Sequence, residues 1–154
     1  MDKLSDSAKL FLEKNKTKKI VFTNGCFDIL HIGHLLYLKE ARELGDVLFL
    51  GLNSDNSVKR LEKGDDRPIN NQNDRKFFLE CLKFVDHVEI FDNDTPYELI
   101  KNVMPNILVK GGDWKPSDIV GSDIVLENGG EVKSLLFKEG YSTTTMIEKL
   151  QGKK

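Results

Sequence analysis

Residues 20–34 read IVFTNGCFDILHIGH, and this stretch decides the fold that we predict. It begins with a short apolar run, Ile20–Thr23, which is typical of a buried strand, and continues into a turn of small and polar residues. An amphipathic helix pattern follows from His31 to Leu44, and Gly45 supplies a stop signal. A strand that passes through a turn into a helix is the first half of a βαβ unit, so the chain is expected to belong to the α/β class.

The same alternation of apolar runs and helix patterns continues along the chain. The expected strands are Ile20–Thr23, Val47–Leu52, Val85–Phe91, Ile107–Val109 and Val132–Phe137. The expected helices are an N-terminal one, His31–Leu44, Asp74–Lys83, Tyr97–Met104 and Ser142–Leu150. Strands separated by helices imply right-handed crossovers and an open, mainly parallel sheet of about five strands with helices on both faces. Ligands of such sheets bind beyond the carboxyl ends of the strands, so the first strand-to-helix turn is the candidate site.

Length and composition narrow the class of protein. The 154 residues suit one domain over 1–154, with an N-terminal helix in 1–17 and a catalytic core in 18–151. The net charge of −2 argues against nucleic acid or an anionic membrane surface as a partner, because both require a basic face. Cys26 and Cys81 are too few for a disulfide framework or a zinc site. No signal peptide or membrane span is evident, so we expect a soluble, cytoplasmic protein.

His31 and His34 form the most informative pair in the turn. Side chains three residues apart share one face of a helix, and Gly33 between them carries no side chain that would block a ligand. A helix N-terminus favours anions, so two imidazoles there would suit a phosphoryl group that gains negative charge. From the spacing alone, a pair that only caps the helix or lies on a solvated face is about equally expected. A metal site is less favoured, because no third ligand is evident.

Two signatures together resemble a known family. GCFDILHIGH, residues 25–34, resembles the first signature of the cytidylyltransferase-like nucleotidylyltransferases, in which HxGH opens a helix of a Rossmann-like fold. The second signature, Ser142-Thr143-Thr144, occurs near the C-terminus, where in the family it begins the last helix and holds the β- and γ-phosphates of the nucleotide. Hydroxyls beside the unpaired amides of a helix start agree with that role.

Three further stretches narrow the resemblance to the adenylyltransferase domain of bacterial ADP-heptose synthases. They are LNSDNSVKRL at 52–61, RPIN at 67–70 and LVKGGDW at 108–114, and the resemblance covers about residues 18–151. Nothing in the chain resembles a sugar kinase, so we expect the free-standing form of this domain. Phe137 and the pair Leu35 and Leu36 stand where other cytidylyltransferases tend to carry arginine and lysine, which favours the heptose branch.

The resemblance implies transfer of AMP from ATP to D-glycero-D-manno-heptose 1-phosphate, giving ADP-heptose and pyrophosphate for lipopolysaccharide or another surface glycan. It implies His31 and His34 as catalytic residues at the α-phosphate. The nucleotide-binding residues that it implies are Asn24, Gly25, Cys26, Phe27, Gly33, Lys110, Gly112, Asp113, Ser142, Thr143 and Thr144. The implied acceptor-binding residues are Asp28, Asn53, Arg67 and Arg75, with Arg75 on the sugar phosphate and Arg67 in a polar loop, 62–73, that covers it. Mg²⁺ is expected as the cofactor, held mainly by the nucleotide phosphates, and a homo-oligomer, dimeric or larger, is expected.

Two alternative functions stay open at this point. One is a cytidylyltransferase that acts on glycerol 3-phosphate or another polyol or sugar phosphate. The other is a non-catalytic nucleotide-binding module. The sequence does not say which residues, if any, would ligate a metal.

Overall fold

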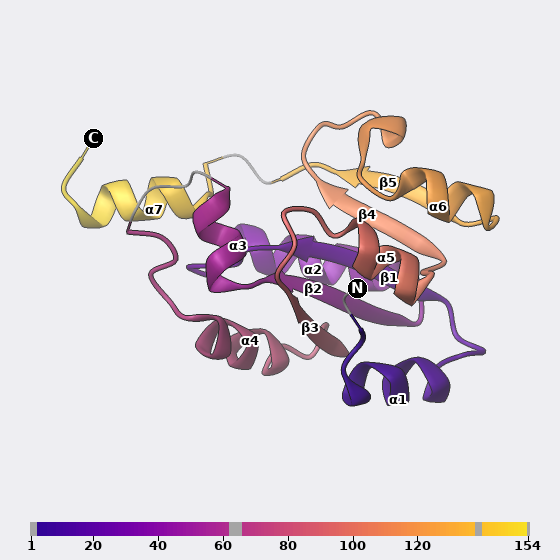
Figure 1. Ribbon diagram of the computed structural model, residues 1–154. Helices are drawn as coiled ribbons and strands as arrows, with labels where there is room; N and C mark the ends of the chain where they lie inside the picture. The colour runs from indigo at the N-terminus through magenta and orange to yellow at the C-terminus, as the bar shows by residue number, and fades with distance from the viewer. Residues whose placement is uncertain (1–2, 62–65, 138–139, 154) are drawn as a thin grey trace.

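The computed structural model, which describes residues 3–61, 66–137 and 140–153, contains a five-stranded parallel sheet in the order β3-β2-β1-β4-β5 (Figure 1). The strands are β1 (Ile20–Gly25), β2 (Val47–Asn53), β3 (His87–Phe91), β4 (Ile107–Gly111) and β5 (Glu131–Leu135). The predicted α/β class and the open parallel sheet are therefore confirmed.

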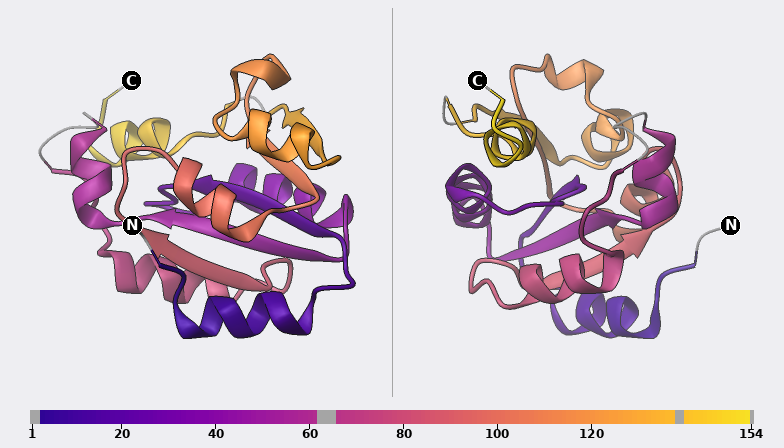
Figure 2. Two further views of the ribbon diagram at one scale, coloured as in Figure 1. Left: turned by 45° about the vertical axis from the view of Figure 1, so that its right-hand side comes forward. Right: turned by 90° about the vertical axis from the view of Figure 1, so that its left-hand side faces the viewer.

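Helices cover both faces of the sheet, as the two views of Figure 2 show. They are α1 (Asp6–Lys14), α2 (Ile32–Glu43), α3 (Asp55–Arg60), α4 (Gln72–Glu80), α5 (Tyr97–Val103), α6 (Ser122–Glu127) and α7 (Thr143–Leu150), with one 3₁₀ turn, η1 (Pro116–Asp118). Successive strand residues face opposite sides, so Val21 packs with α2 and α4 in one core, whereas Phe22 packs with α1 and α5 in the other. Strands buried on both faces explain the nearly continuous apolar runs of the sequence.

Several predicted element boundaries need correction. Helix α4 runs over Gln72–Glu80 where Asp74–Lys83 was predicted, and β1 and β4 each continue two residues further than predicted. β3 begins at His87 and not at Val85, because Val85 lies in a turn in which its N–H donates to the carbonyl of Leu82 (3.1 Å). β5 ends at Leu135, two residues before the predicted Phe137. The short helices α3 and α6 were not predicted at all.

The order of the strands places the candidate site. β1 lies between β2 and β4, so the direction in which strands are added reverses beside β1. Loops that leave the carboxyl ends of β1 and β4 diverge to opposite faces at this point and leave a crevice between them. The turn after β1 carries residues 26–31, which include the first half of the HxGH signature.

Candidate active site

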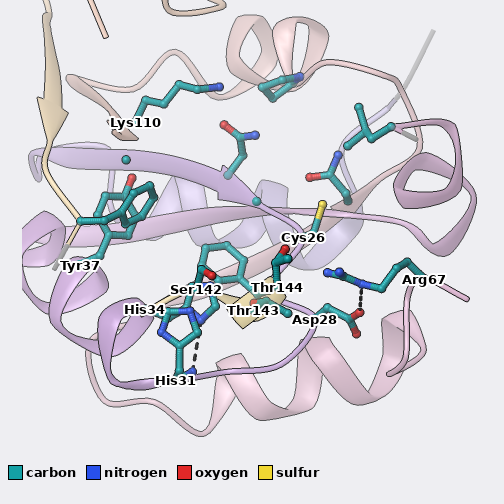
Figure 3. Close-up of a pocket in the computed structure, with 18 of the residues that line it drawn as sticks. Cys26, Asp28, His31, His34, Tyr37, Arg67, Lys110, Ser142, Thr143 and Thr144 are labelled. Atoms are coloured by element: carbon teal, nitrogen blue, oxygen red, sulfur yellow. Dashed lines mark hydrogen bonds and ion pairs between the residues drawn. The ribbon is translucent and has the colours of Figure 1, made fainter. Parts of the chain in front are cut away.

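A cavity of about 590 Å³ lies beyond the carboxyl ends of the strands (Figure 3). Every strand contributes through its last residues or through the loop that follows it. The lining consists of Asn24, Gly25, Cys26, Phe27, Asp28, His31, His34, Tyr37, Asn53, Leu61, Arg67, Asp94, Thr95, Pro96, Lys110, Gly111, Val120, Phe137, Tyr141, Ser142, Thr143 and Thr144. The volume falls in the range of cavities that hold small-molecule ligands.

His31 and His34 form a stacked pair at the N-terminus of α2. Their ring centroids are 3.8 Å apart with an interplanar angle of 29°. His31 is the N-cap, and its Nδ1 accepts a hydrogen bond from the Gly33 amide (3.1 Å). The Nδ1 of His34 accepts from the His31 amide (3.3 Å), which completes a reciprocal capping box. The pair therefore does cap the helix, as one of the two interpretations predicted, and it also lines the cavity.

These hydrogen bonds fix the tautomer of both rings. A neutral imidazole that accepts at Nδ1 carries its proton on Nε2, so each ring offers one Nε2–H donor. Burial and, to a smaller extent, the neighbouring His31 lower the pKa of His34 to about 4. Burial also lowers the pKa of His31. Both rings are therefore neutral donors at pH 7, and they can stabilise a negative oxygen without taking part in proton transfer.

Gly33 has a role other than the predicted one. It is buried, and a Cβ at this position would lie 2.9 Å from the imidazole of His31 and 3.1 Å from Cβ of Tyr141. The glycine therefore makes room for the His31 ring and for the segment that leads into α7. It does not line the cavity, where we expected it to leave space for a ligand.

The second signature meets the first one at the N-terminus of α7. Thr143 Oγ1 donates to the carbonyl of Ile29 (3.1 Å) in the turn after β1. Ser142 is the N-cap, and its Oγ accepts from the Thr145 amide (2.9 Å). The amides of Thr143 and Thr144 occupy the first two helical positions, where no acceptor exists within the helix. In Figure 3, Ser142, Thr143 and Thr144 lie beside His31 and His34. Histidine donors and amide donors therefore converge on one part of the cavity.

Asp28 joins the turn after β1 to the loop that follows α3 through an ion pair and hydrogen bonds. Its carboxylate accepts from Arg67 Nε (2.8 Å) and from the amides of Ile69 (2.9 Å) and Asn70 (2.9 Å). The Asp28 side chain is fully buried and that of Arg67 is nearly so. The pair leaves the terminal nitrogens of Arg67 at the cavity, opposite Lys110 and Tyr37 (Figure 3). Residues 62–65 of the predicted covering loop lie outside the described residues.

The geometry around Arg75 does not favour the expected contact with a sugar phosphate. The side chain is fully buried, and its donors are used by the carbonyls of Asn70 (2.9 Å), Cys26 (2.7 Å) and Asn53 (2.8 Å) and by the carboxylate of Asp55 (2.8 Å). Arg75 does not line the cavity. Its hydrogen bonds join the carboxyl ends of β1 and β2, so Arg75 has a structural role.

Of the residues predicted at the end of β4 and in the loop that follows it, only some line the cavity. Lys110 lines the cavity, and burial lowers its pKa. Its Nζ lies 4.7 Å from the ring centroid of Trp114. Gly112 and Asp113 do not line the cavity, because the loop folds back and Trp114 Nε1 donates to the carbonyl of Gly111 (3.1 Å).

Several lining residues were not predicted as site residues. They are Tyr37, Leu61, Asp94, Thr95, Pro96, Gly111, Val120, Phe137 and Tyr141. Asp94 to Pro96 follow β3, and their position after a strand is the one signal that could have identified them. Tyr37 had no such signal, because an aromatic residue inside a helix pattern is usually counted as core.

The described residues contain neither a cluster of metal ligands nor a membrane-spanning helix. No group of three or more His, Cys, Asp or Glu residues in 3–61, 66–137 and 140–153 could hold a metal ion. None of the helices in the described part of the chain is both long and apolar enough to cross a membrane.

Comparison with known proteins gives a consistent result. The model of the family described as cytidylyltransferase-like matches residues 22–149. The bifunctional protein HldE of Nitratiruptor sp. is 62% identical over 134 residues, which are 87% of this chain and 28% of the relative. HldE of Aliarcobacter butzleri is 58% identical over 137 residues, 89% of this chain and again 28% of the relative. The chain thus spans less than a third of the length of these relatives.

Solved structures give the same fold. The crystal structure of a lipopolysaccharide core biosynthesis protein from Thermoplasma volcanium superposes with a TM-score of 0.66 at 28% identity, over 81% of this chain and 99% of the other. Pantothenate synthetase from Thermus thermophilus superposes with a TM-score of 0.54 at 14% identity, over 84% of this chain and 59% of the other, which is a likeness of fold alone.

Proposed function

The chain belongs to the cytidylyltransferase-like family of nucleotidyltransferases, and on that premise we propose that it transfers AMP from ATP to D-glycero-D-manno-heptose 1-phosphate. The products would be ADP-heptose and pyrophosphate, used in lipopolysaccharide or surface glycan synthesis. The observation that carries this proposal is the convergence of His31, His34 and the start of α7 on one part of the cavity. The high identity to HldE proteins and the likeness to a lipopolysaccharide core biosynthesis protein support the heptose branch.

The chemistry follows from the charges at that point. An oxygen of the acceptor phosphate attacks the α-phosphorus of ATP, the bond from that phosphorus to the bridging oxygen breaks, and pyrophosphate leaves with the electron pair. The attacking oxygen is already an anion, so the step needs no general base, and catalysis consists of positioning and of stabilising charge. The Nε2–H groups of His31 and His34 donate to the α-phosphate, where negative charge accumulates in the transition state.

The leaving group and the acceptor are held by different elements. The amides of Thr143 and Thr144, at the positive end of the helix dipole of α7, bind the β- and γ-phosphates. The terminal nitrogens of Arg67 bind the phosphate of the acceptor, because a guanidinium matches two phosphate oxygens at once. Arg67 takes over the role that the sequence had suggested for Arg75, which is fully buried and makes four hydrogen bonds within the protein.

Enzymes of this family use a divalent metal together with the nucleoside triphosphate. We propose Mg²⁺, carried by the phosphate oxygens of ATP, since the described residues offer no group of three acidic, histidine or cysteine ligands. When bound in this way the metal neutralises part of the charge of the triphosphate.

We also propose that the enzyme works in the cytoplasm, where ATP is available, and as a homo-oligomer. Sedimentation equilibrium tests the oligomeric state.

The experiment that tests the function is pyrophosphate release in the presence of Mg²⁺. ATP, CTP and GTP are each combined with both anomers of the heptose 1-phosphate and with glycerol 3-phosphate. Release with ATP and one heptose anomer alone is the expected result. Release with CTP and glycerol 3-phosphate would assign the chain to the alternative cytidylyltransferase reaction. Nucleotide binding without release in any combination would indicate a non-catalytic binding module.

A further inference from the structure

The two ends of the cavity differ in chemical character. The end beyond β2 and β3 is lined mainly by polar groups, Asn53, Arg67, Asp94 and Thr95, with Leu61 and Pro96 beside them. The end at β4 and β5 is lined mainly by aromatic and apolar groups, Tyr37, Val120 and Phe137, with one charged group, Lys110. In Figure 3, Tyr37 and Lys110 lie at one end, Arg67 lies at the other, and His31, His34 and Ser142 lie between them.

The ring of Phe137 is held in place at the β4–β5 end of the cavity and is partly exposed there. Half of its accessible surface remains exposed, although its ring packs on the backbone of Gly111, where a methyl group would overlap it. On another side the ring lies 5.6 Å, centroid to centroid, from that of Tyr37. The hydroxyl of Tyr37 is hydrogen-bonded to Thr23 Oγ1 (2.6 Å). This bond fixes the Tyr37 side chain, which supports the Phe137 ring. Gly111 and Tyr37 therefore hold the ring on two sides, and half of its surface remains accessible.

We propose that Phe137 stacks on the nucleobase and makes the enzyme prefer a purine to a pyrimidine nucleotide. This proposal rests on the function proposed above and adds to it the residue that selects the nucleotide. In-line attack places the acceptor opposite the leaving pyrophosphate, and the nucleoside extends from the α-phosphate in a third direction. Because the acceptor phosphate is assigned to Arg67, the base is assigned to the end of the cavity away from Arg67. The polar end matches a sugar with many hydroxyl groups, and the aromatic end matches a flat base. A two-ring purine covers more of an aromatic face than a one-ring pyrimidine does, so stacking favours ATP over CTP.

Leu136 provides a matched control. It precedes Phe137, it is more exposed (73%), and it does not line the cavity. The variants are Phe137→Ala, Phe137→Trp, which keeps an aromatic face, and Leu136→Ala. Because Phe137 is half exposed, its truncation is expected to leave the fold intact, and a thermal melt of each variant checks this.

The test is calorimetric titration of the full chain, in the presence of Mg²⁺, with ATP, with CTP and with inorganic tripolyphosphate, which has no base. Phe137→Ala is expected to weaken ATP binding about tenfold or more, equivalent to about 1.4 kcal/mol, and to weaken CTP binding less. Tripolyphosphate binding should change less than about twofold, and Leu136→Ala should behave as the unaltered protein. Phe137→Trp should restore ATP binding.

The possible failures are distinguishable. If the unaltered protein binds none of the three compounds, the proposed function itself fails. If it binds ATP and Phe137→Ala binds ATP equally well, the stacking proposal is overturned and the function stands. If Phe137→Ala loses ATP and tripolyphosphate to the same extent, the ring positions the segment before α7 and does not stack on a base, which also overturns the proposal.

Discussion

The buried ion pair of Asp28 and Arg67 offers a sharp test of how the site is held together. In Asp28→Asn, Oδ1 is retained and can still accept from the amides of Ile69 and Asn70 (3.0 and 2.9 Å). The atom replaced by an NH₂ group is Oδ2, which accepts from Arg67 Nε (2.8 Å) and also lies 2.9 Å from the Ile69 amide nitrogen. The substitution therefore removes one charge of a buried ion pair and keeps the two hydrogen bonds to Oδ1.

The expected cost follows from burial. Removal of one partner of a buried pair costs about 3–5 kcal/mol, because the remaining charge is left without compensation. The side chain of Arg67 is 10% exposed and can reach some water, so we expect the lower value, about 3 kcal/mol. With a urea dependence of about 2 kcal/mol per molar, the unfolding midpoint should fall by about 1.5 M. The KM for the acceptor should rise more than the KM for ATP, since Arg67 would lose its orientation.

Two comparisons make this result interpretable. Glu43→Gln breaks an exposed pair with Lys39 (3.0 Å) and should cost less than about 1 kcal/mol. Replacement of both partners, Asp28→Asn with Arg67→Met, removes the uncompensated charge and should recover part of the stability lost in the single variant. A change below about 1 kcal/mol in Asp28→Asn would refute the structural role that we assign to the pair.

Three other predictions concern the histidine pair. His34→Ala should lower kcat about 10²–10³-fold in the pyrophosphate assay without lowering the melting temperature much, and near-normal turnover would show that this ring does not act at the α-phosphate. Gly33→Ala should displace the His31 ring, because the new Cβ would lie 2.9 Å from it, and should reduce kcat, with the loss of the His31 cap costing the helix about 1 kcal/mol; unchanged kcat would contradict the packing. The pKa of His34 is about 4 in the folded protein and 6.5 as its ordinary value, so the unfolded chain binds more protons between these values. The free energy of unfolding should therefore be highest above pH 6.5 and fall toward pH 4, and urea titrations should show a weaker fall in His34→Gln; an equal fall would locate the proton uptake elsewhere.

The sheet was predictable because its strands are buried on both faces and read as apolar runs separated by helix patterns. The short helices α3 and α6 were not, because six residues give too few turns for an apolar period to be visible. The end of β5 was misplaced for a related reason. Leu136 and Phe137 are as apolar as the strand, yet they leave the sheet and are exposed, and only the fold shows that one of them lines the cavity.

The candidate site was predictable where two signatures coincide and less so where single residues were assigned. His31, His34 and the Ser142–Thr144 segment do meet at the cavity, as the order of the strands requires. An arginine in a polar stretch gives no sign of whether it faces a ligand or the interior, and the sequence could not rank Arg67 above Arg75. Burial decides this question, because Arg75 is fully buried and makes four hydrogen bonds to atoms of the first two strand ends and of the α3–α4 region.

The division of the cavity by strand ends has a consequence for how substrate choice can be altered. The lining residues of the polar wall fall between positions 53 and 96 and those of the aromatic wall between 110 and 137, apart from Tyr37, and most of them lie in loops beyond the paired strand residues. The donors at the centre come from two other segments. If the two walls act as proposed, the selection of acceptor and the selection of nucleotide are encoded in separate blocks of the gene. A laboratory library confined to one block would explore new acceptors while nucleotide choice and the reacting centre stay constant.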